Sequence, residues 1–207
     1  MIRVHHLNNS RSQRVLWLLE EIGLPYEIVR YQRKASMLAP QELKHVHALG
    51  KSPVIEDDGK KFAETGLIVG YLVERYGPDL APARNNDLHW RYRYWLHYAE
   101  GSLMPPLLLK LVVKRLGLLG LPARRFVDAQ IKLHLDFLEA ELAEAPWFLG
   151  DRFSAADIML SFPLEAAAHR AGLDQTRPRL MDFLARIHAR PAYQRAIEKG
   201  GAYLYGG

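Results

Sequence analysis

The sequence predicts an α/β domain at the start of the chain and an all-helical domain after it. Strand patterns occur only before residue 64, where they alternate with helical stretches. Gly and Pro interrupt the chain at residues 77–82, and every later periodic stretch has helical spacing. The predicted domains are therefore residues 1–78 and 87–207, joined by a linker at 79–86.

The first half of the α/β domain is predicted to be a strand, a helix and a strand. Residues 2–7 alternate, with their β-branched side chains on one face, and residues 26–31 form the second strand. Between them a helix opens at Ser10, and Gly23 ends it with a left-handed cap. The apolar stripe of this helix recurs at i, i+3, i+4 and i+7 and consists of Val15, Leu18, Leu19 and Ile22. This order predicts a right-handed crossover between two parallel strands.

The second half of this domain is predicted to be a hairpin followed by a helix. A polar stretch at residues 39–47 contains a short helix that begins near Pro40. Asp58-Gly59 then lies between two apolar runs and predicts a tight turn, because Gly adopts a positive φ at little steric cost. A helix over residues 65–76 follows. The order βαβ and then ββα is that of a thioredoxin-like domain, a four-stranded mixed sheet with helices on both faces.

The second domain is predicted to be a bundle of helices. They cover residues 87–111, 122–145, 154–171, 177–189 and 192–199. We expect Pro105 and Pro106 to kink the first of them. The third begins with a capping box, Ser154–Asp157, which nucleates a core helix. The second carries the apolar residues Phe126, Ile131, Leu135, Leu138 and Leu142.

Composition argues against several classes of site. The chain has 207 residues, no cysteine and a formal net charge of +5, so disulfides, thiolate metal sites and a protein thiol nucleophile are excluded. Basic residues are interleaved with 23 acidic ones, which argues against a nucleic-acid-binding surface. His5-His6 and His45-Val46-His47 lack the spacing and partners of a metal site, so no metal is expected. The most apolar window, residues 103–121, contains two prolines and three basic residues and predicts no membrane span.

Two residue pairs that flank the hairpin predict a binding site for a small zwitterionic peptide. Pro53 begins a strand and has no N–H, so the backbone of Ser52 is expected to remain free for an extended ligand. Glu64 and Thr65 lie where a strand gives way to a helix, and the first N–H groups of a helix can bind a carboxylate. Residues 52–65 therefore contain three features of such a site, namely a free peptide edge, a carboxylate and an anion-binding helix start.

The start of the first helix has two interpretations. Ser10-Arg11-Ser12-Gln13 matches a capping box, in which Ser10 accepts from the N–H of Gln13 and the Gln13 side chain reaches back. In the other interpretation, the Ser10 hydroxyl donates a hydrogen bond to an anion, such as a thiolate, that the helix dipole already favours. Asn9 and Ser12 are competing donors.

Over essentially its whole length, the chain resembles the glutathione S-transferases. The resemblance rests on the features above and on three further segments. Each motif alone is weak, whereas their order and spacing are specific. The resemblance is strongest to a fungal and bacterial branch with an H-x-L-x-x-S-R start, an L-G-[KR]-S-P segment and a Y-x-E-G-S-L-x-P-P helix. Here these motifs are His5–Arg11, Leu49–Pro53 and Tyr98–Pro106.

The resemblance implies a glutathione site, position by position. Pro53 would follow a cis peptide bond, and the Ser52 backbone would pair with the cysteinyl part of glutathione. Glu64 would bind the γ-glutamyl ammonium. The Thr65 hydroxyl and the amide at the helix start would bind the α-carboxylate, and Lys51 would lie near the glycyl carboxylate.

The resemblance also implies the chemistry. A donor near the end of the first strand would lower the pKa of the bound thiol, and Ser10 is preferred to the two competing donors. The resulting thiolate would attack a small hydrophobic electrophile. We expect Tyr98, Ser102 and Met104 to line the cleft that holds this electrophile.

The predicted function is therefore that of a cytoplasmic, dimeric glutathione transferase, with glutathione as co-substrate. A glutathione-dependent peroxidase or disulfide reductase on the same scaffold is the first alternative, because bound glutathione would supply all the sulfur. A non-catalytic interaction module that has kept the fold is the second. The expected partners are glutathione, small electrophiles and a second copy of the chain, with no nucleic acid and no membrane span.

Overall fold

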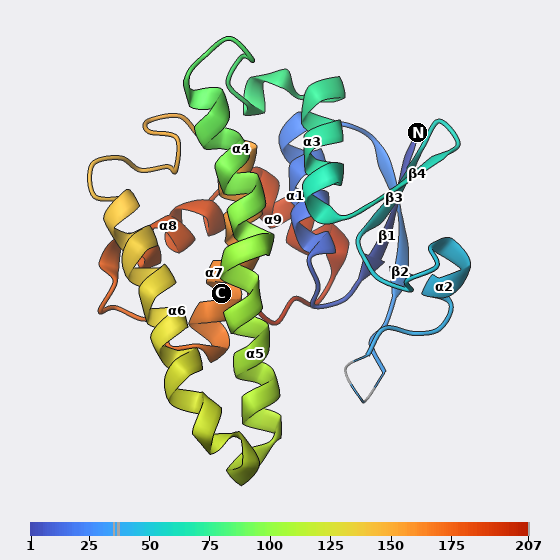
Figure 1. Cartoon of the computed structure of the whole chain (residues 1–207). Helices are drawn as coiled ribbons and strands as arrows, with labels where there is room; N and C mark the ends of the chain where they lie inside the picture. Colours follow the sequence, from blue (N-terminus) through green and yellow to red (C-terminus); the bar gives the residue numbers. More distant parts are fainter. Residues whose placement is uncertain (35, 37, 207) are drawn as a thin grey trace. The chain divides into compact units, whose positions relative to one another are not determined.

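The computed structural model describes residues 1–34, 36 and 38–206, and the chain divides into two compact units (Figure 1). The N-terminal unit comprises Met1–Ala81 together with the C-terminal segment from His188 on. The helical unit comprises Pro82–Ile187. The boundary at Ala81 lies within the expected linker, whereas the last helix groups with the N-terminal unit and not with the bundle.

The sheet of the N-terminal unit has four strands in the order β2-β1-β3-β4. β1 pairs with β2 in parallel and with β3 antiparallel, and β4 pairs with β3 antiparallel. The predicted four-stranded mixed sheet is therefore confirmed. Asp58 and Gly59 turn the hairpin with φ values of 48° and 75°. The strands are β1 (Ile2–Leu7), β2 (Tyr26–Tyr31), β3 (Val54–Asp57) and β4 (Lys60–Ala63).

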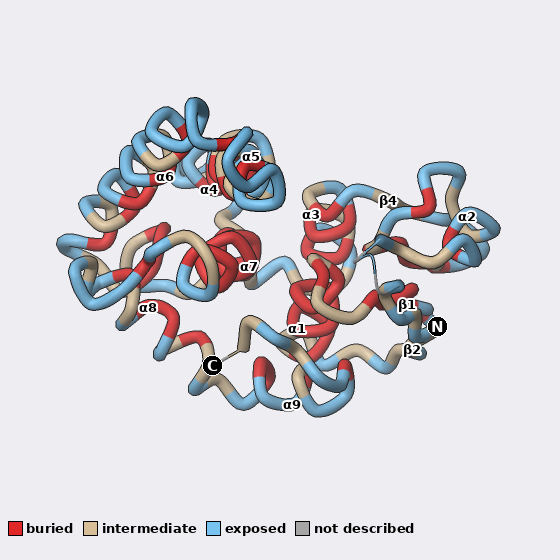
Figure 2. The backbone as a smooth tube through the Cα atoms, turned by 90° about the horizontal axis from the view of Figure 1, so that it is seen from below, coloured by how far each residue is buried: buried red, intermediate tan, exposed pale blue. Residues whose placement is uncertain are grey.

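Helices cover both faces of this sheet, as the sequence predicts. Figure 2 shows α1 and α3 on one side of the strands and α2 on the other. α1 is the most buried of them and packs against β1, α3 and α9. Gly23 ends α1 at a φ of 77°, and its N–H donates to the carbonyl of Leu19, as expected of a left-handed cap. The elements are α1 (Ser12–Ile22), α2 (Leu43–Val46), α3 (Thr65–Tyr76), the 3₁₀ turn η1 (Pro78–Leu80) and α9 (Pro191–Gly200).

Ion pairs between α1 and α9 explain why the last helix belongs to the N-terminal unit. Arg190 donates two hydrogen bonds to Glu21, at 2.6 and 2.8 Å. Arg195 Nε lies 2.9 Å from a carboxylate oxygen of Glu20, which is itself buried. These partners are about 170 residues apart along the chain, so no local pattern in the sequence predicts that they meet.

The helical unit begins with a helix that changes its winding. The stretch expected to be one kinked helix at 87–111 is two α-helices joined by a π-helical turn, and it extends to Arg115. Pro105 and Pro106 lie in the first turn of the second helix, where a missing N–H costs little. The elements are α4 (Leu88–Tyr98), the π turn η2 (Ala99–Leu103), α5 (Met104–Arg115), the 3₁₀ turn η3 (Gly117–Gly120), α6 (Leu121–Glu141), α7 (Ala155–Arg170) and α8 (Pro178–His188).

α7 forms the centre of the helical unit, and its predicted capping box is confirmed. The Ser154 hydroxyl accepts from the N–H of Ala156 at 3.2 Å, and Asp157 accepts from the N–H of Ser154 at 2.8 Å. On α6, Val127 is buried whereas Phe126 is 63% exposed. Within the described residues, no helix is long and apolar enough to cross a membrane.

Candidate functional site

One edge of the sheet brings together residues that are distant in the sequence. In the strand register, His5 of β1 lies opposite Val54 of β3, and Val54 lies opposite Ala63 of β4. Because these strands alternate in direction, the residues after β1, before β3 and after β4 all lie at this edge. Asn9, Ser52 and Glu64 occupy these three positions.

The start of β3 has the geometry that the resemblance implies. The Ser52–Pro53 peptide bond is cis. The Ser52 hydroxyl donates to the carbonyl of His5 at 2.8 Å and ties this segment to the end of β1. The ladder between β1 and β3 ends at the pair His5–Val54, so the Ser52 backbone lies beyond it. The peptide group of Ser52, which pairs with no strand, therefore lies beside the end of β1.

The start of α3 provides a carboxylate and an anion-binding helix terminus. Glu64 is exposed and has a φ of 71°, and its carbonyl accepts from the N–H of Ile68 at 2.9 Å. Thr65 is the first residue of α3 and is buried. The amides of the first turn have no partner within the helix and carry the positive end of its dipole. Glu64 therefore favours a cationic group of a ligand, whereas the helix start at Thr65 beside it favours an anionic group.

Lys51 and Glu64 are the charged side chains available at this edge. Both are exposed. Neither side chain makes a hydrogen bond or an ion pair with any residue that the structure describes. A ligand that carries an ammonium group and carboxylates therefore finds an anion, a cation and a helix start without displacing an existing ion pair.

The two serines near the start of α1 are buried and bonded to each other. Ser10 Oγ lies 2.7 Å from Ser12 Oγ, and Ser12 Oγ lies 2.9 Å from Nδ1 of His6. Burial, together with the charge of Arg30, lowers the pKa of His6 to about 4, although a hydrogen bond to the backbone of Gly200 acts the other way. His6 is therefore neutral at pH 7. In this form its Nδ1 accepts a hydrogen bond from Ser12, and the ring also makes a hydrogen bond with the backbone of Gly200. Ser12 Oγ also lies 3.2 Å from the carbonyl oxygen of Leu7, so the hydroxyls of Ser10 and Ser12 both have partners within this network.

The predicted capping box at Ser10–Gln13 does not form, and this prediction was wrong. Ser10 Oγ accepts from the N–H of Ser12 at 3.2 Å, and the N–H of Gln13 bonds the backbone carbonyl of Ser10 at 3.1 Å. The Gln13 side chain is buried, and neither of its polar atoms finds a partner among the described residues. The helix therefore begins at Ser12, without a side-chain cap.

Asn9 is the remaining candidate donor, and its geometry differs from that of the serines. It is half-buried and has a φ of 51°, a conformation that Asn tolerates better than most residues. Its Oδ1 accepts from the N–H of Leu204 at 2.7 Å, and its backbone carbonyl accepts from Arg33 at 3.2 Å. Its Nδ2 donates to no residue in the described part of the chain. Asn9 therefore presents an oriented N–H donor that Ser10 and Ser12 do not.

The three residues expected to contact an electrophile all lie in the helical unit. Tyr98 is buried, and its hydroxyl lies 2.7 Å from Nδ1 of His134. Burial raises the pKa of Tyr98 above its ordinary value, so this phenol remains protonated. Met104 is also buried, whereas Ser102 is half-buried in the π turn. A substrate contact at these positions stays a prediction.

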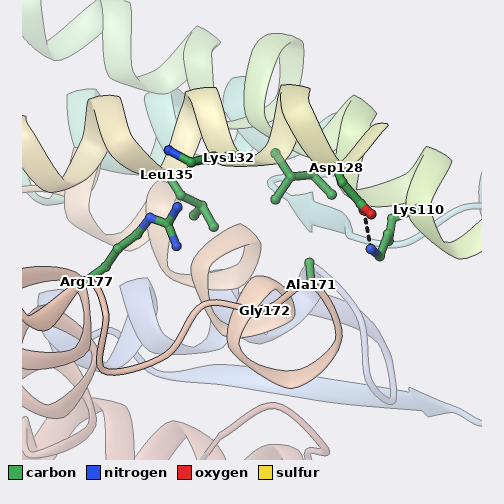
Figure 3. A pocket seen from close by; sticks show the side chains of 8 residues that line it. Lys110, Asp128, Lys132, Leu135, Ala171, Gly172 and Arg177 are labelled. Atoms are coloured by element: carbon green, nitrogen blue, oxygen red, sulfur yellow. Dashed lines mark hydrogen bonds and ion pairs between the residues drawn. The ribbon is translucent and has the colours of Figure 1, made fainter. Parts of the chain in front are cut away.

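A separate hollow lies within the helical unit, between α5, α6 and the segment before α8 (Figure 3). Its volume is about 160 Å³, and Lys110, Lys132 and Arg177 line it. Each of these cations already has an acidic partner, because Lys110 pairs with Asp128 whereas Lys132 and Arg177 both pair with Asp136. Ligand pockets usually measure about 300–1,000 Å³. This hollow is therefore too small and too well neutralised to compete with the sheet edge.

Comparisons with known proteins point to one family. The model of the N-terminal domain of glutathione S-transferases matches residues 1–74, and the model of their C-terminal domain matches residues 121–186. Glutathione S-transferase 1 of Saccharomyces cerevisiae is 35% identical over 98% of this chain and 96% of its own length. The crystal structure of a glutathione S-transferase from Actinobacillus pleuropneumoniae is 36% identical, with a TM-score of 0.90 over 99% of this chain and 94% of that one. A sphingomonad glutathione S-transferase complexed with glutathione shares the fold at 23% identity, with a TM-score of 0.81 over 96% of this chain and 98% of that one.

Proposed function

The chain belongs to the glutathione S-transferase family, and from this premise we propose which of its residues bind glutathione and activate its thiol. It is an enzyme of that family, and glutathione is its co-substrate. The observation that carries the proposal is the meeting of Asn9, Ser52 and Glu64 at one edge of the sheet. At this edge Asn9 supplies a hydrogen-bond donor, Ser52 a backbone peptide group that pairs with no strand, and Glu64 a carboxylate without an ion-pair partner.

Glutathione would lie extended along this edge. Its cysteinyl backbone would pair with the backbone of Ser52, where the ladder ends. Its γ-glutamyl ammonium would meet Glu64, and the neighbouring α-carboxylate would bind the Thr65 hydroxyl and the first amides of α3. Lys51 would neutralise the glycyl carboxylate. Each ionic group of the peptide thus meets a protein group of opposite charge, and hydrogen bonds to charged groups contribute about 1.5–3 kcal/mol each.

We propose Asn9 as the donor to the glutathione thiolate, in place of Ser10. A free thiol with a pKa of about 8.5 is only a few per cent ionised at neutral pH. Lowering that pKa by two units requires about 2.7 kcal/mol of selective stabilisation of the thiolate. One amide donor together with the dipole of α1 can supply most of this free energy. Ser10 and Ser12 would support the turn that carries Asn9.

The activated thiolate would attack an electrophilic carbon of a small hydrophobic substrate and form a C–S bond as the leaving group departs with its electron pair. The proton released from the thiol goes to solvent. Tyr98, Ser102 and Met104 remain the proposed contacts of this substrate. We also propose a homodimer, and the exposed Trp90 and Tyr94 on α4 support it.

Thiolate absorbance of bound glutathione, followed against pH, tests the proposed activation. In the wild-type protein the thiol pKa should lie about two units below its free value of about 8.5. Asn9→Gly tolerates the positive φ but removes the amide, and it should raise the bound-thiol pKa by about one to two units. Ser10→Ala should change this pKa by much less. The reverse order of effects would restore Ser10 as the donor.

Glutathione affinity in the same titration tests the binding site. Glu64→Gln keeps the shape of the side chain and removes its charge, so affinity should fall about 10- to 100-fold. An analogue of glutathione without the γ-glutamyl ammonium should bind the wild type and Glu64→Gln equally. An equal loss for both ligands would mean that Glu64 acts through the fold and does not contact the ammonium.

A further inference from the structure

The hairpin of α5 and α6 ends in an exposed apolar tip. Four leucines form it, and we refer to them as the leucine tip. They are Leu116, Leu118, Leu119 and Leu121, which are 50%, 83%, 84% and 51% exposed. Figure 1 shows this tip at the lower end of the hairpin, beyond the other helices of its unit. A single exposed leucine is ordinary, whereas four in six consecutive positions mark a contact surface.

The turn that carries the leucine tip has a defined geometry. Gly117 has a φ of 57°, which favours glycine. A Cβ on Gly120 would lie 2.3 Å from the carbonyl oxygen of Val113, so only glycine allows the two helices to approach this closely. The N–H of Leu119 donates to the carbonyl of Leu116 at 3.2 Å. The leucines are therefore held outward by the turn, and their exposure does not come from a loose loop.

The charge around the leucine tip has one sign. Residues 101–127 contain five basic side chains and no acidic one. Two of the five, Lys110 and Arg124, pair with Asp128 just beyond this segment. The other three are exposed and make no hydrogen bond or ion pair within the described residues. They are Lys114, Arg115 and Arg125, which flank the four leucines on both sides.

We propose that the leucine tip binds the surface of an anionic lipid membrane. The leucines would enter the boundary between headgroups and acyl chains, and the three free cations would meet the anionic headgroups, over which their long side chains can extend. The contact is peripheral, since no described helix can cross a membrane. A fluid apolar layer accepts a convex leucine cluster of any shape.

Other occupants fit this surface less well. A second copy of the tip would bring at least six free cations together, and like charges at close range repel. A folded protein partner would need both an acidic rim and a hollow shaped to the four leucines. The pairing of apolar and cationic groups is the combination that an anionic bilayer matches.

Co-sedimentation with lipid vesicles tests the proposal. The wild-type protein should bind vesicles of phosphatidylserine and phosphatidylcholine, and much more weakly vesicles of phosphatidylcholine alone. Leu118→Ser combined with Leu119→Ser should reduce binding about 10- to 100-fold, because two leucines no longer leave water. Lys114→Gln, Arg115→Gln and Arg125→Gln together should reduce it about 100-fold, since each cation near an anionic surface contributes about fivefold. Leu38→Ser, at a residue that is 64% exposed outside the tip, is the matched control and should bind like the wild type.

A fluorophore attached to the leucine tip distinguishes insertion of the tip into the lipid from electrostatic attraction to the membrane surface. Because the chain has no cysteine, Leu118→Cys carries a unique site for an environment-sensitive fluorophore. Its emission should shift to the blue with phosphatidylserine vesicles, whereas the same label at Leu38→Cys should not shift. An unchanged melting temperature of each variant confirms that the fold is intact.

Three outcomes would overturn the proposal. The first is no binding to anionic vesicles at low salt. The second is binding that survives the leucine substitutions or leaves the Leu118 label in water. The third is self-association without lipid that the leucine substitutions abolish, which would assign the tip to a second copy of the chain.

Discussion

Asn9 and Glu64 both adopt a positive φ, at 51° and 71°, although neither is glycine. Such conformations cost about 1–3 kcal/mol and persist where the surrounding structure demands them. Asp58 shares the property, but it lies in the hairpin turn, which requires it. Asn9 lies in the turn between β1 and α1, and Glu64 lies between β4 and α3. Both residues flank strands that end at the same edge of the sheet, and unusual backbone conformations cluster at functional sites, which supports their proposed roles.

His6 shows how a residue outside the proposed contacts can determine the site's geometry. It is a buried residue of β1, its neutral ring lies 2.9 Å from Oγ of Ser12, and it also hydrogen-bonds the backbone of Gly200 at the end of α9. Ser12 is bonded both to this ring and to Ser10, so the hydroxyls of both serines have partners within the protein. The sequence shows a histidine pair at this point but not the direction in which each ring faces.

His6 should make stability depend on pH below neutrality. Its pKa is about 4 in the folded protein against 6.5 ordinarily, so between these values the unfolded chain binds a proton that the folded chain does not. Stability is therefore fully present above pH 6.5 and should fall by up to about 3 kcal/mol as the pH approaches 4. Urea unfolding at a series of pH values measures this slope.

The slope should be reduced, but not removed, in His6→Gln. Burial also lowers the pKa of His5, whose hydrogen bond to Glu56 acts the other way, so His5 contributes in the same direction over this range. Parallel stability curves for the wild type and His6→Gln would show that His6 is not held neutral by the fold.

At the scale of elements, two similar sequence patterns have different outcomes. Ser154 has the extended backbone of a helix cap, and its box with Asp157 forms. Ser10 follows the left-handed Asn9 and bonds Ser12, and the Gln13 side chain lies under α9. A Cβ on Gly200 would lie only 2.7 Å from Oε1 of Gln13. The close approach of another helix, and not the local pattern, determines how α1 begins.

Ser154→Ala should therefore destabilise the helical unit by about 1 kcal/mol, and at most about 2, because an N–H of the first turn of α7 loses its acceptor. Ser154→Thr keeps the hydroxyl and should cost a few tenths of this amount. The free energy of urea unfolding measures both. Equal losses in the two variants would indicate a packing effect and not a lost cap.

At the scale of the whole molecule, the chain returns to its first domain at its end. α9 packs on α1, and the segment after it places the N–H of Leu204 on Asn9. Glu20 accepts from Arg195 at 2.9 Å, from Tyr26 at 2.8 Å and from Lys199 at 2.5 Å. Burial acts to raise the Glu20 pKa, but these hydrogen bonds outweigh it and lower the pKa. The contribution of Glu20 to stability is thus present above its ordinary pKa and lost as the pH falls through the lowered value.

Glu20→Gln should loosen α9 from α1. We expect a loss of about 1–2 kcal/mol at neutral pH, since both cationic partners are half-exposed and screened by water. Hydrogen exchange should become faster in α1 and α9 and stay unchanged in α7. Glu144→Gln, at an exposed residue of the helical unit, is the control. Faster exchange in α7 as well would mean that the substitution acts on the whole chain.

Much of the architecture follows from the sequence alone. The spacing of apolar residues and the turn at Asp58-Gly59 predict the four strands and most helices, because these features act over a few residues. The pairs Ser52-Pro53 and Glu64-Thr65 predict a site for a zwitterionic peptide for the same reason, since each occupies the end of one element. The family motifs then predict the co-substrate.

Only the tertiary structure decided which partners the candidate donors at the start of α1 bond and where the last helix packs. Ser10 and Asn9 are adjacent, and their difference arises from His6, Gly200 and Leu204, which reach them from other elements. The exposure of the leucine tip could not be predicted from the sequence either, because an apolar run has the same pattern whether it faces a core or solvent. Local sequence determines which groups are present, whereas contacts between distant segments determine which of these groups remain free to act.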